Sequence, residues 1–407
     1  MRMYRQPEPK HTPAIRDAAR DLGLAIPGLA LAAALVVMSP IACGRTDEHA
    51  AGDVARTDIY DHTHAGDLSP AAERARPLVY VPNSMSSSVT EIDPATYTVV
   101  RTLRVGPLPQ HVVPGYDLTR LWVLSNKANT ATPIDPTSGL AGRPVDVTDP
   151  YNMYFTPDGR FAIVVAEAGQ RLDFRQPNDL RVVKSIRVDC RGINHMEFTP
   201  DGRFAIATCE FAGRLARIDL TADTVAGILA LGNDTTDASM PQDIRSSPDG
   251  RIFFVADMRA DGVWLIDPIA FRAVGFLKTG IGAHGIYPSR DGRFLYVTNR
   301  GWHTIRGGPR GPGSVSVIDP VARSVVAQWR VPGGGSPDMA TSPRMGVSCG
   351  CPAATTARCT CSTRRAGSSR IAFQSVASHT DCVYGPSQAA IRWATRATCA
   401  EWLSEIV

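Results

Sequence analysis

The chain has 407 residues and a formal net charge of +4, with 43% hydrophobic and 20% charged residues. This length suffices for two average domains or for one large all-β domain. The small net charge and the lack of a basic cluster argue against a nucleic-acid-binding protein. The 35 glycines and 31 prolines are spread along the chain and predict many turns.

Residues 1–43 have the pattern of an export signal. Basic residues between Arg2 and Arg20 precede an uncharged stretch from Leu22 to Gly44, whose centre is apolar. Small residues follow before a potential cleavage point. A basic leader, an apolar segment and small residues in this order are typical of secreted proteins.

The end of this segment, Ile-Ala-Cys43-Gly, resembles a bacterial lipobox, in which the cysteine becomes the lipidated first residue. Pro40 stands where that pattern usually has leucine. A lipid on Cys43 would hold the protein at the outer face of a membrane. Three alternatives stay open: an uncleaved signal anchor, because 23 uncharged residues can span a bilayer, plain secretion, or a start codon assigned in the wrong place.

Residues 44–77 are rich in alanine, aspartate and arginine and lack apolar periodicity, so we expect a flexible tether. His62 and His64 lie beside acidic residues in this stretch. On a strand they would share one face and could bind a metal ion. On a polar linker we expect a solvated pair.

From residue 78 the chain repeats a turn followed by a run of strand-forming residues. The Asp-Gly turns recur every 42 to 48 residues. The turn sequences are Asp117-Leu-Thr-Arg120, Pro157-Asp-Gly-Arg160, Pro200-Asp-Gly-Arg203, Pro248-Asp-Gly-Arg251 and Arg290-Asp-Gly-Arg293. A period of 40 to 50 residues with four short strands predicts an all-β fold, a β-propeller of four-stranded blades.

One repeat shows the four expected strands. They are residues 195–199, 204–208, 214–218 and 225–229. The second is apolar throughout, as a strand buried on both faces should be. The blades are expected to pack face to face.

The repeats resemble the YVTN family of β-propellers and are close to YncE-like proteins. Tyr296-Val-Thr-Asn299 is the family signature, and Tyr80-Val-Pro-Asn83 is a variant of it. The resemblance covers roughly residues 78–343. It implies an extracytoplasmic propeller of usually seven blades, of which about six are recognisable here, and no assigned activity. It also implies that a C-terminal strand completes the first blade.

The pattern ends after Pro343. Six of the nine cysteines fall in residues 344–407, which lack a strand-and-turn rhythm. A disulfide or zinc module is one interpretation, but the Cys-x-Cys pairs fit a structural zinc site poorly. Reading permitted codons two nucleotides on restores an Asp-Gly-type turn, an apolar strand and a third-strand motif. We therefore interpret 344–407 as an irregular, out-of-frame tail, with the frameshift between Pro343 and Gly346, and expect the chain as written to fold poorly.

Aligning the repeats on their turns puts one polar residue per blade at the start of the first strand. The residues are His111, Asn152, His195, Asp243, His284 and Asp338. In the first four the residue stands six positions before the turn aspartate, and His284 stands seven before. Such a ring at a channel mouth could bind a metal ion, a polar ligand or a cofactor. Alternatively, these residues cap backbone groups and hold ordered water.

Two further features concern chemistry. Cys190 and Cys209 could form a disulfide in an exported protein, or remain free and buried. The repeats are also similar to the haem d1 propeller of nitrite reductases, but the chain has no Cys-x-x-Cys-His motif, so no haem ligand is inferred.

We expect an extracytoplasmic, membrane-tethered propeller that binds a small polar ligand or a cell-envelope protein, without a cofactor. The rival hypothesis is a redox propeller that holds a cofactor or metal over the channel. A third possibility is a nonfunctional product of a damaged gene. No nucleophile–base–acid arrangement or pair of carboxylates identifies an enzyme.

Overall fold

The computed structural model describes residues 58–60, 67–232, 238–303, 308–331, 335–341, 348–350, 358–362, 371–374 and 383–384. From residue 340 onward it describes the backbone pairing of strands only. The export signal, Cys43 and the pair His62 and His64 lie outside these residues.

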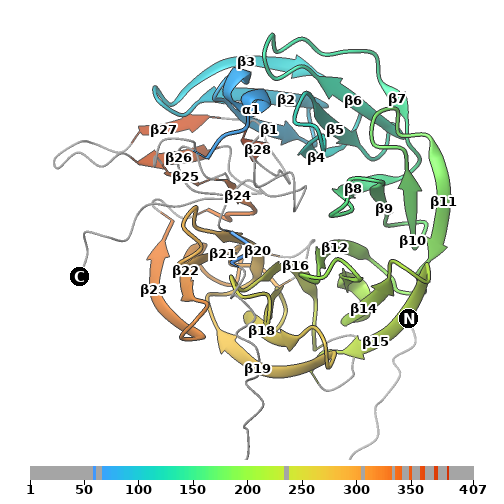
Figure 1. Ribbon diagram of the computed structural model, residues 1–407. Coiled ribbons are helices and arrows are strands. Elements are labelled where there is room, and N and C mark those ends of the chain that lie inside the picture. Colours follow the sequence, from blue (N-terminus) through green and yellow to red (C-terminus); the bar gives the residue numbers. More distant parts are fainter. Residues whose placement is uncertain are drawn as a thin grey trace, which may run out of the picture. The chain divides into compact units, whose positions relative to one another are not determined.

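The described chain is almost entirely β-strand, arranged in four-stranded antiparallel sheets that follow one another around a central axis (Figure 1). The first three blades have the strands β28 (Val383–Tyr384), β1 (Val79–Asn83), β2 (Ser88–Asp93) and β3 (Thr98–Arg104); β4 (Pro109–Pro114), β5 (Leu121–Ser125), β6 (Thr130–Ile134) and β7 (Val145–Asp146); β8 (Pro150–Phe155), β9 (Ala162–Ala166), β10 (Arg171–Arg175) and β11 (Val182–Arg187).

The next three blades complete the six that derive from the repeat. Their strands are β12 (Ile193–Phe198), β13 (Phe204–Cys209), β14 (Arg214–Asp219) and β15 (Thr224–Ala230); β16 (Pro241–Ser246), β17 (Phe253–Asp257), β18 (Gly262–Asp267) and β19 (Arg272–Lys278); β20 (Ala283–Pro288), β21 (Leu295–Asn299), β22 (Ser314–Asp319) and β23 (Ser324–Arg330). The propeller of four-stranded blades expected from the repeat, with about six recognisable of an expected seven, is thus confirmed for these six.

The fourth blade shows how the sequence produces this unit. The predicted strands are all present, and the first begins two residues earlier than expected, at Ile193. β13 is buried along nearly its whole length, whereas β15 on the rim alternates between exposed and half-buried residues. Between β13 and β14 the chain makes a short 3-10 turn, Glu210–Ala212, which ends at Gly213 in the left-handed conformation. Glycine has no Cβ to oppose that backbone.

The hydrophobic core lies between neighbouring blades. Between the third and fourth blades, Phe174 and Val165 join Met196 and Ile218 in one buried cluster. Trp122 of the second blade packs in the same way against the third blade and is 1% exposed. Each sheet therefore buries both faces against its neighbours, which explains why the inner strands are apolar throughout.

The ring of blades is closed by the C-terminal part of the chain. β28 pairs antiparallel with β1, through Val79 with Tyr384 and Tyr80 with Val383. This confirms the closing strand implied by the family resemblance. A further four-stranded sheet consists of β24 (Ala340–Thr341), β25 (Ser348–Gly350), β26 (Arg358–Ser362) and β27 (Ile371–Gln374).

The segment expected to be irregular therefore carries strands. Strand pairing uses main-chain groups that every residue except proline supplies, so it does not depend on the reading frame. The frameshift between Pro343 and Gly346 stays a prediction, because the side chains of this part lie outside the described residues.

Part of the expected tether lies against the propeller. Tyr60 is 3% exposed, and its hydroxyl donates a hydrogen bond of 2.8 Å to the backbone oxygen of Ser246. Helix α1 (Pro70–Arg74) begins at Ser69, whose hydroxyl accepts from the N–H of Ala72. Ala72 packs against the buried Leu118. The boundary of the folded part thus lies before residue 78.

Candidate functional site at the mouth of the propeller

We call the end of the propeller at which the first strands begin the mouth. Five of the six predicted ring residues lie on the first strands of successive blades, and Asp338 lies two residues before β24. All six side chains are buried, with exposed fractions from 0% for Asp243 to 8% for His284. The alignment on the turns therefore located buried positions, which are equivalent in the second to fifth blades.

His195 is the centre of one group of ring residues. Its Nδ1 lies 3.3 Å from Asn152 Nδ2, 3.2 Å from the Tyr154 hydroxyl and 3.6 Å from Asp243 Oδ1. The His111 ring meets it edge-on, with centroids 5.4 Å apart. Because three polar groups from the two flanking blades approach one nitrogen, a change in its protonation would change all three contacts.

The pKa of His195 lies well below its usual value. Burial away from water is the main cause, and the positive charge of His111, Arg245 and His284 adds to it. The imidazole is therefore neutral at neutral pH, and it can donate a hydrogen bond from one nitrogen and accept one at the other.

Asp243 joins two blades. Its carboxylate accepts hydrogen bonds from the backbone N–H groups of Ile244 (2.9 Å) and Ile286 (3.0 Å), the latter on the next blade. It also forms an ion pair with Arg245, which is itself buried. Asp243 thus caps backbone groups, which is the alternative role left open for the ring residues, while it also faces His195.

His284 and Asp338 form a second group with Arg300. His284 Nδ1 and Arg300 Nε lie 3.1 Å and 3.3 Å from Asp338 Oδ1. The register of β20 against β21 matches that of β12 against β13, so Gly285, not His284, takes the position equivalent to His195. The N–H of Gly285 donates to Thr298 Oγ1 at 2.9 Å, just as that of His195 donates to Thr208 Oγ1 at 3.0 Å.

A close approach explains the glycine. A Cβ on Gly285 would lie 2.7 Å from Met339 Sδ and 3.0 Å from the backbone oxygen of Asp338, so a side chain there would force its neighbours to shift. The polar group moves one residue earlier, to His284. His284 therefore stands seven residues before the turn aspartate Asp291, whereas the ring residues of the preceding four blades stand six before theirs.

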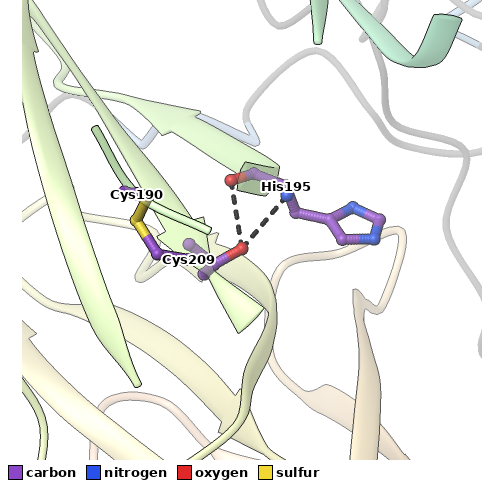
Figure 2. The surroundings of a disulfide bond; sticks show 4 residues. Cys190, His195 and Cys209 are labelled. Atoms are coloured by element: carbon purple, nitrogen blue, oxygen red, sulfur yellow. Dashed lines mark hydrogen bonds between the residues drawn. A yellow bond between two sulfur atoms is a disulfide. The ribbon is translucent and has the colours of Figure 1, made fainter. Parts of the chain in front are cut away.

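A disulfide lies beside His195. Cys190 and Cys209 are bonded, with their Cα atoms 5.6 Å apart, so the disulfide alternative is confirmed (Figure 2). Cys209 ends β13 and follows Thr208, whose hydroxyl accepts from the His195 N–H and donates to the His195 carbonyl (Figure 2). The crosslink therefore fixes the strand that holds the backbone of His195.

Sequence reasoning missed the acidic residues at the mouth. Glu167 directly follows β9 and Glu210 directly follows β13, at equivalent positions of the third and fourth blades. Asn194 Nδ2 donates to Glu210 Oε2 at 2.9 Å. Both positions follow the second strand, where Arg300 stands in the sixth blade. Counting from the end of the second strand would have found them.

Both glutamates have a pKa above the ordinary value for a glutamate side chain. Burial raises the pKa of Glu210 to about 7, although hydrogen bonds from Gln242 and Asn194 oppose this rise. Burial, with the negative charges of Glu210 and Asp149, raises the pKa of Glu167 to about 8. Glu210 is 4% exposed and Glu167 is half-buried.

Two wider searches concern the described residues alone. Among them, no three or more histidine, cysteine or acidic residues are grouped so that they could hold a metal ion. No helix in that part of the chain is long and apolar enough to cross a membrane.

Comparison with solved structures identifies many propellers of the same fold. Hydrazine synthase of Kuenenia stuttgartiensis is 17% identical, with a TM-score of 0.55, and the match covers 74% of this chain and 93% of that one. A putative 6-phosphogluconolactonase of Bacteroides uniformis is 15% identical, with a TM-score of 0.58 and coverage of 75% and 99%. A protein of unknown function from Desulfotomaculum acetoxidans is also 15% identical, with a TM-score of 0.56 and coverage of 80% and 100%.

At these identities the likeness shows the fold alone. No curated protein matches the sequence. A family profile described as YNCE-like β-propeller matches residues 55–358, which is most of the chain. The protein therefore belongs to the YncE-like β-propeller family.

Proposed function

We propose that this protein is an extracytoplasmic, membrane-tethered propeller that binds a small polar ligand at its mouth. The observation that carries the proposal is the convergence of Asn152, His195 and Asp243, from three successive blades, around one imidazole nitrogen. A neutral histidine held between an amide and a carboxylate can both donate and accept hydrogen bonds, as a polar ligand requires.

The ring residues make this proposal testable with a panel of small polar metabolites. A compound that binds the mouth raises the melting temperature of the wild-type protein, because it binds the folded state alone. The same compound should lose its effect in Asn152→Ala and in His195→Gln. Asn178→Ala, in an exposed turn, is the matched control and should respond like the wild type. Retention of the shift in both ring variants, or no shift with any compound, would overturn the proposal.

The location is supported by two features. The leader ends in the lipobox-like Cys43, and the Cys190–Cys209 disulfide is of a kind that persists in oxidising compartments outside the cytosol. Cells that express the protein and are fed a labelled fatty acid should label the wild type and Ser39→Ala, but not Cys43→Ala. Equal labelling of Cys43→Ala would exclude lipid attachment at that residue.

The reading frame decides which chain performs this function. A frameshift between Pro343 and Gly346 would replace the side chains of the last blade and of the closing strand. Losing the packing of two blade faces, a few hundred Å² each, would cost on the order of 10 kcal/mol per face. Resequencing the codons for residues 340–350 tests the frame. An intact frame, together with soluble, cooperatively melting protein from the chain as written, would refute the frameshift.

A further inference from the structure

Two carboxyl groups at the mouth have no counter-ion. Glu167 and Glu210 occupy equivalent positions of neighbouring blades, and neither forms an ion pair with any described residue. The positive charge of Arg300 acts on Glu210, but Arg300 is ion-paired with Asp338. Carboxyl groups removed from water are ordinarily paired with a cation or held protonated. Glu167 and Glu210 are therefore held partly protonated unless a cation from outside the described residues pairs with them.

The neighbouring amide provides an independent observation. Asn194 is fully buried, and its Nδ2 donates to Glu210 Oε2 at 2.9 Å. Its carbonyl oxygen, Oδ1, is buried without a hydrogen-bond partner. An unsatisfied buried acceptor costs about 1–3 kcal/mol, so such groups are retained where something else satisfies them. This acceptor lies beside the Glu210 carboxyl.

The three acceptors fit an ammonium group better than a metal ion. A –NH₃⁺ group has three N–H donors and no acceptor. A calcium ion requires six to eight oxygen ligands, and the described residues offer no cluster of three metal-ligating side chains. The half-buried Glu167 leaves the group accessible from solvent, whereas Asn194 and Glu210 lie deeper.

We propose that the mouth binds the primary ammonium group of a small organic amine, with Glu167, Glu210 and Asn194 Oδ1 accepting its three N–H bonds. The inference rests on the proposed function, because it names the chemical class of ligand for the same mouth. The carboxyl groups are already out of water in the free protein, so the amine does not have to desolvate them on binding.

Binding should release protons. The pKa of Glu210 is raised to about 7 and that of Glu167 to about 8, so both carry protons in part at neutral pH. The other charged groups that act on them are Asp149 on Glu167, and Arg300 with Asp338 on Glu210. The amine arrives already protonated, and each carboxyl that accepts from it transfers its own proton to the buffer. Affinity should therefore rise between pH 6 and pH 8.

Isothermal titration with butylamine tests the inference, with the uncharged butyramide and the anion butyrate as comparison probes. We expect butylamine to bind the full-length wild-type protein at pH 8, at least tenfold more tightly than at pH 6. Titrations in two buffers of different ionisation heat should show that protons are released. Glu210→Gln and Glu167→Gln should each weaken binding at least tenfold. Glu73→Gln, on the exposed face of α1, is the control and should bind like the wild type.

The outcomes separate the two proposals. Unchanged butylamine affinity in both glutamine variants, or equal binding of butyramide, overturns the ammonium inference. The proposed function survives that result if a panel compound still depends on Asn152 and His195. If no compound of the panel and no amine binds the wild type, both proposals fail.

Discussion

The turn end and the mouth end of the blades differ in their residues: the turns repeat the same residues and hydrogen bonds, whereas the mouth positions vary. At the turn end, the carboxylate of the turn aspartate accepts from the N–H two residues later in every Asp-Gly blade, at 3.0 to 3.2 Å. It also accepts from a serine or threonine hydroxyl two residues earlier, at 2.5 to 2.7 Å. At the mouth, equivalent positions carry His, Asn, Asp and Gly. The turn positions are the same in all these blades and stabilise the blade fold. The mouth positions differ from blade to blade and are therefore available for binding a specific ligand.

The acids at the two ends also differ in their pKa. Partial burial raises the pKa of the turn residue Asp158, but hydrogen bonds from Thr156 and Arg160 outweigh it, so the net pKa is lowered. At the mouth, burial outweighs the hydrogen bonds, and the pKa of Glu210 rises to about 7. Turn carboxylates therefore stabilise the fold in their charged form, whereas Glu210 stabilises it in its neutral form.

The largest expected difference between the two ends is in the free energy of unfolding that is lost when an aspartate is replaced by alanine. Asp243→Ala would leave the buried Arg245 without its carboxylate and Ile286 N–H without an acceptor, at a cost of about 3–5 kcal/mol in the free energy of unfolding. Asp117→Ala, in the exposed turn of the second blade, should cost less than about 1 kcal/mol. Urea denaturation measures both.

A double variant distinguishes loss of this ion pair from a general failure to fold. Asp243→Ala combined with Arg245→Met removes the unpaired charge and should recover part of the lost stability. If the two single aspartate variants lose the same stability, the proposed contrast between the ends is wrong.

The next largest effect concerns pH. Glu210 has a folded pKa of about 7 against an ordinary value of 4.5, so the wild type is most stable below pH 4.5 with respect to this group and loses that stability as the pH rises through 7. Glu210→Gln should therefore raise the free energy of unfolding by on the order of 3 kcal/mol at pH 8.5. At pH 4.5 it should change little. Denaturation at both pH values, with Glu73→Gln as control, measures this; a variant less stable than the wild type at pH 8.5 would contradict it.

Two turn glycines allow a finer comparison within one end. Gly202 and Gly250 both have φ of +69°, but a Cβ on Gly250 would lie 2.1 Å from Pro200 Cγ, whereas on Gly202 the nearest atom is Pro157 Cγ at 3.5 Å. Gly202→Ala should cost about 1 kcal/mol for the left-handed backbone alone. Gly250→Ala should cost about 2–3 kcal/mol because the contact adds to it. Thermal melting of the two variants tests the order, and equal melting temperatures would refute it.

The smallest effect is expected at the turn carboxylates. The lowered pKa of Asp158 gives stability that is present above its ordinary pKa and is lost as the pH falls through the folded value. Because the side chain is 47% exposed, solvent screening limits the effect of Asp158→Asn to under about 1 kcal/mol. An acid titration of the folded state should show a shallower loss below pH 4 in the variant. A shift on the alkaline side instead would contradict the assignment.

The contrast between the ends also explains what the sequence could predict. The turns recur, so they fixed the strands of the fourth blade to within two residues and located His111, Asn152, His195 and Asp243. In the sixth blade a count of six residues before Asp291 leads to Gly285, and the alignment took its polar neighbour His284 instead, because the close approach of Met339 has no trace in the local sequence. Glu167 and Glu210 stand outside the repeated motif. The disulfide stayed undecided because a separation of 19 residues does not give a distance in space.

The pairing of β28 with β1 has a consequence for the order of assembly. The first blade to be synthesised is the last to be completed, since its innermost strand arrives some 300 residues later. Until then the inner edge of β1 offers unpaired backbone groups to any other strand. Contacts between such distant residues form slowly. A chain that stops before β28 leaves its first blade without the strand that completes it.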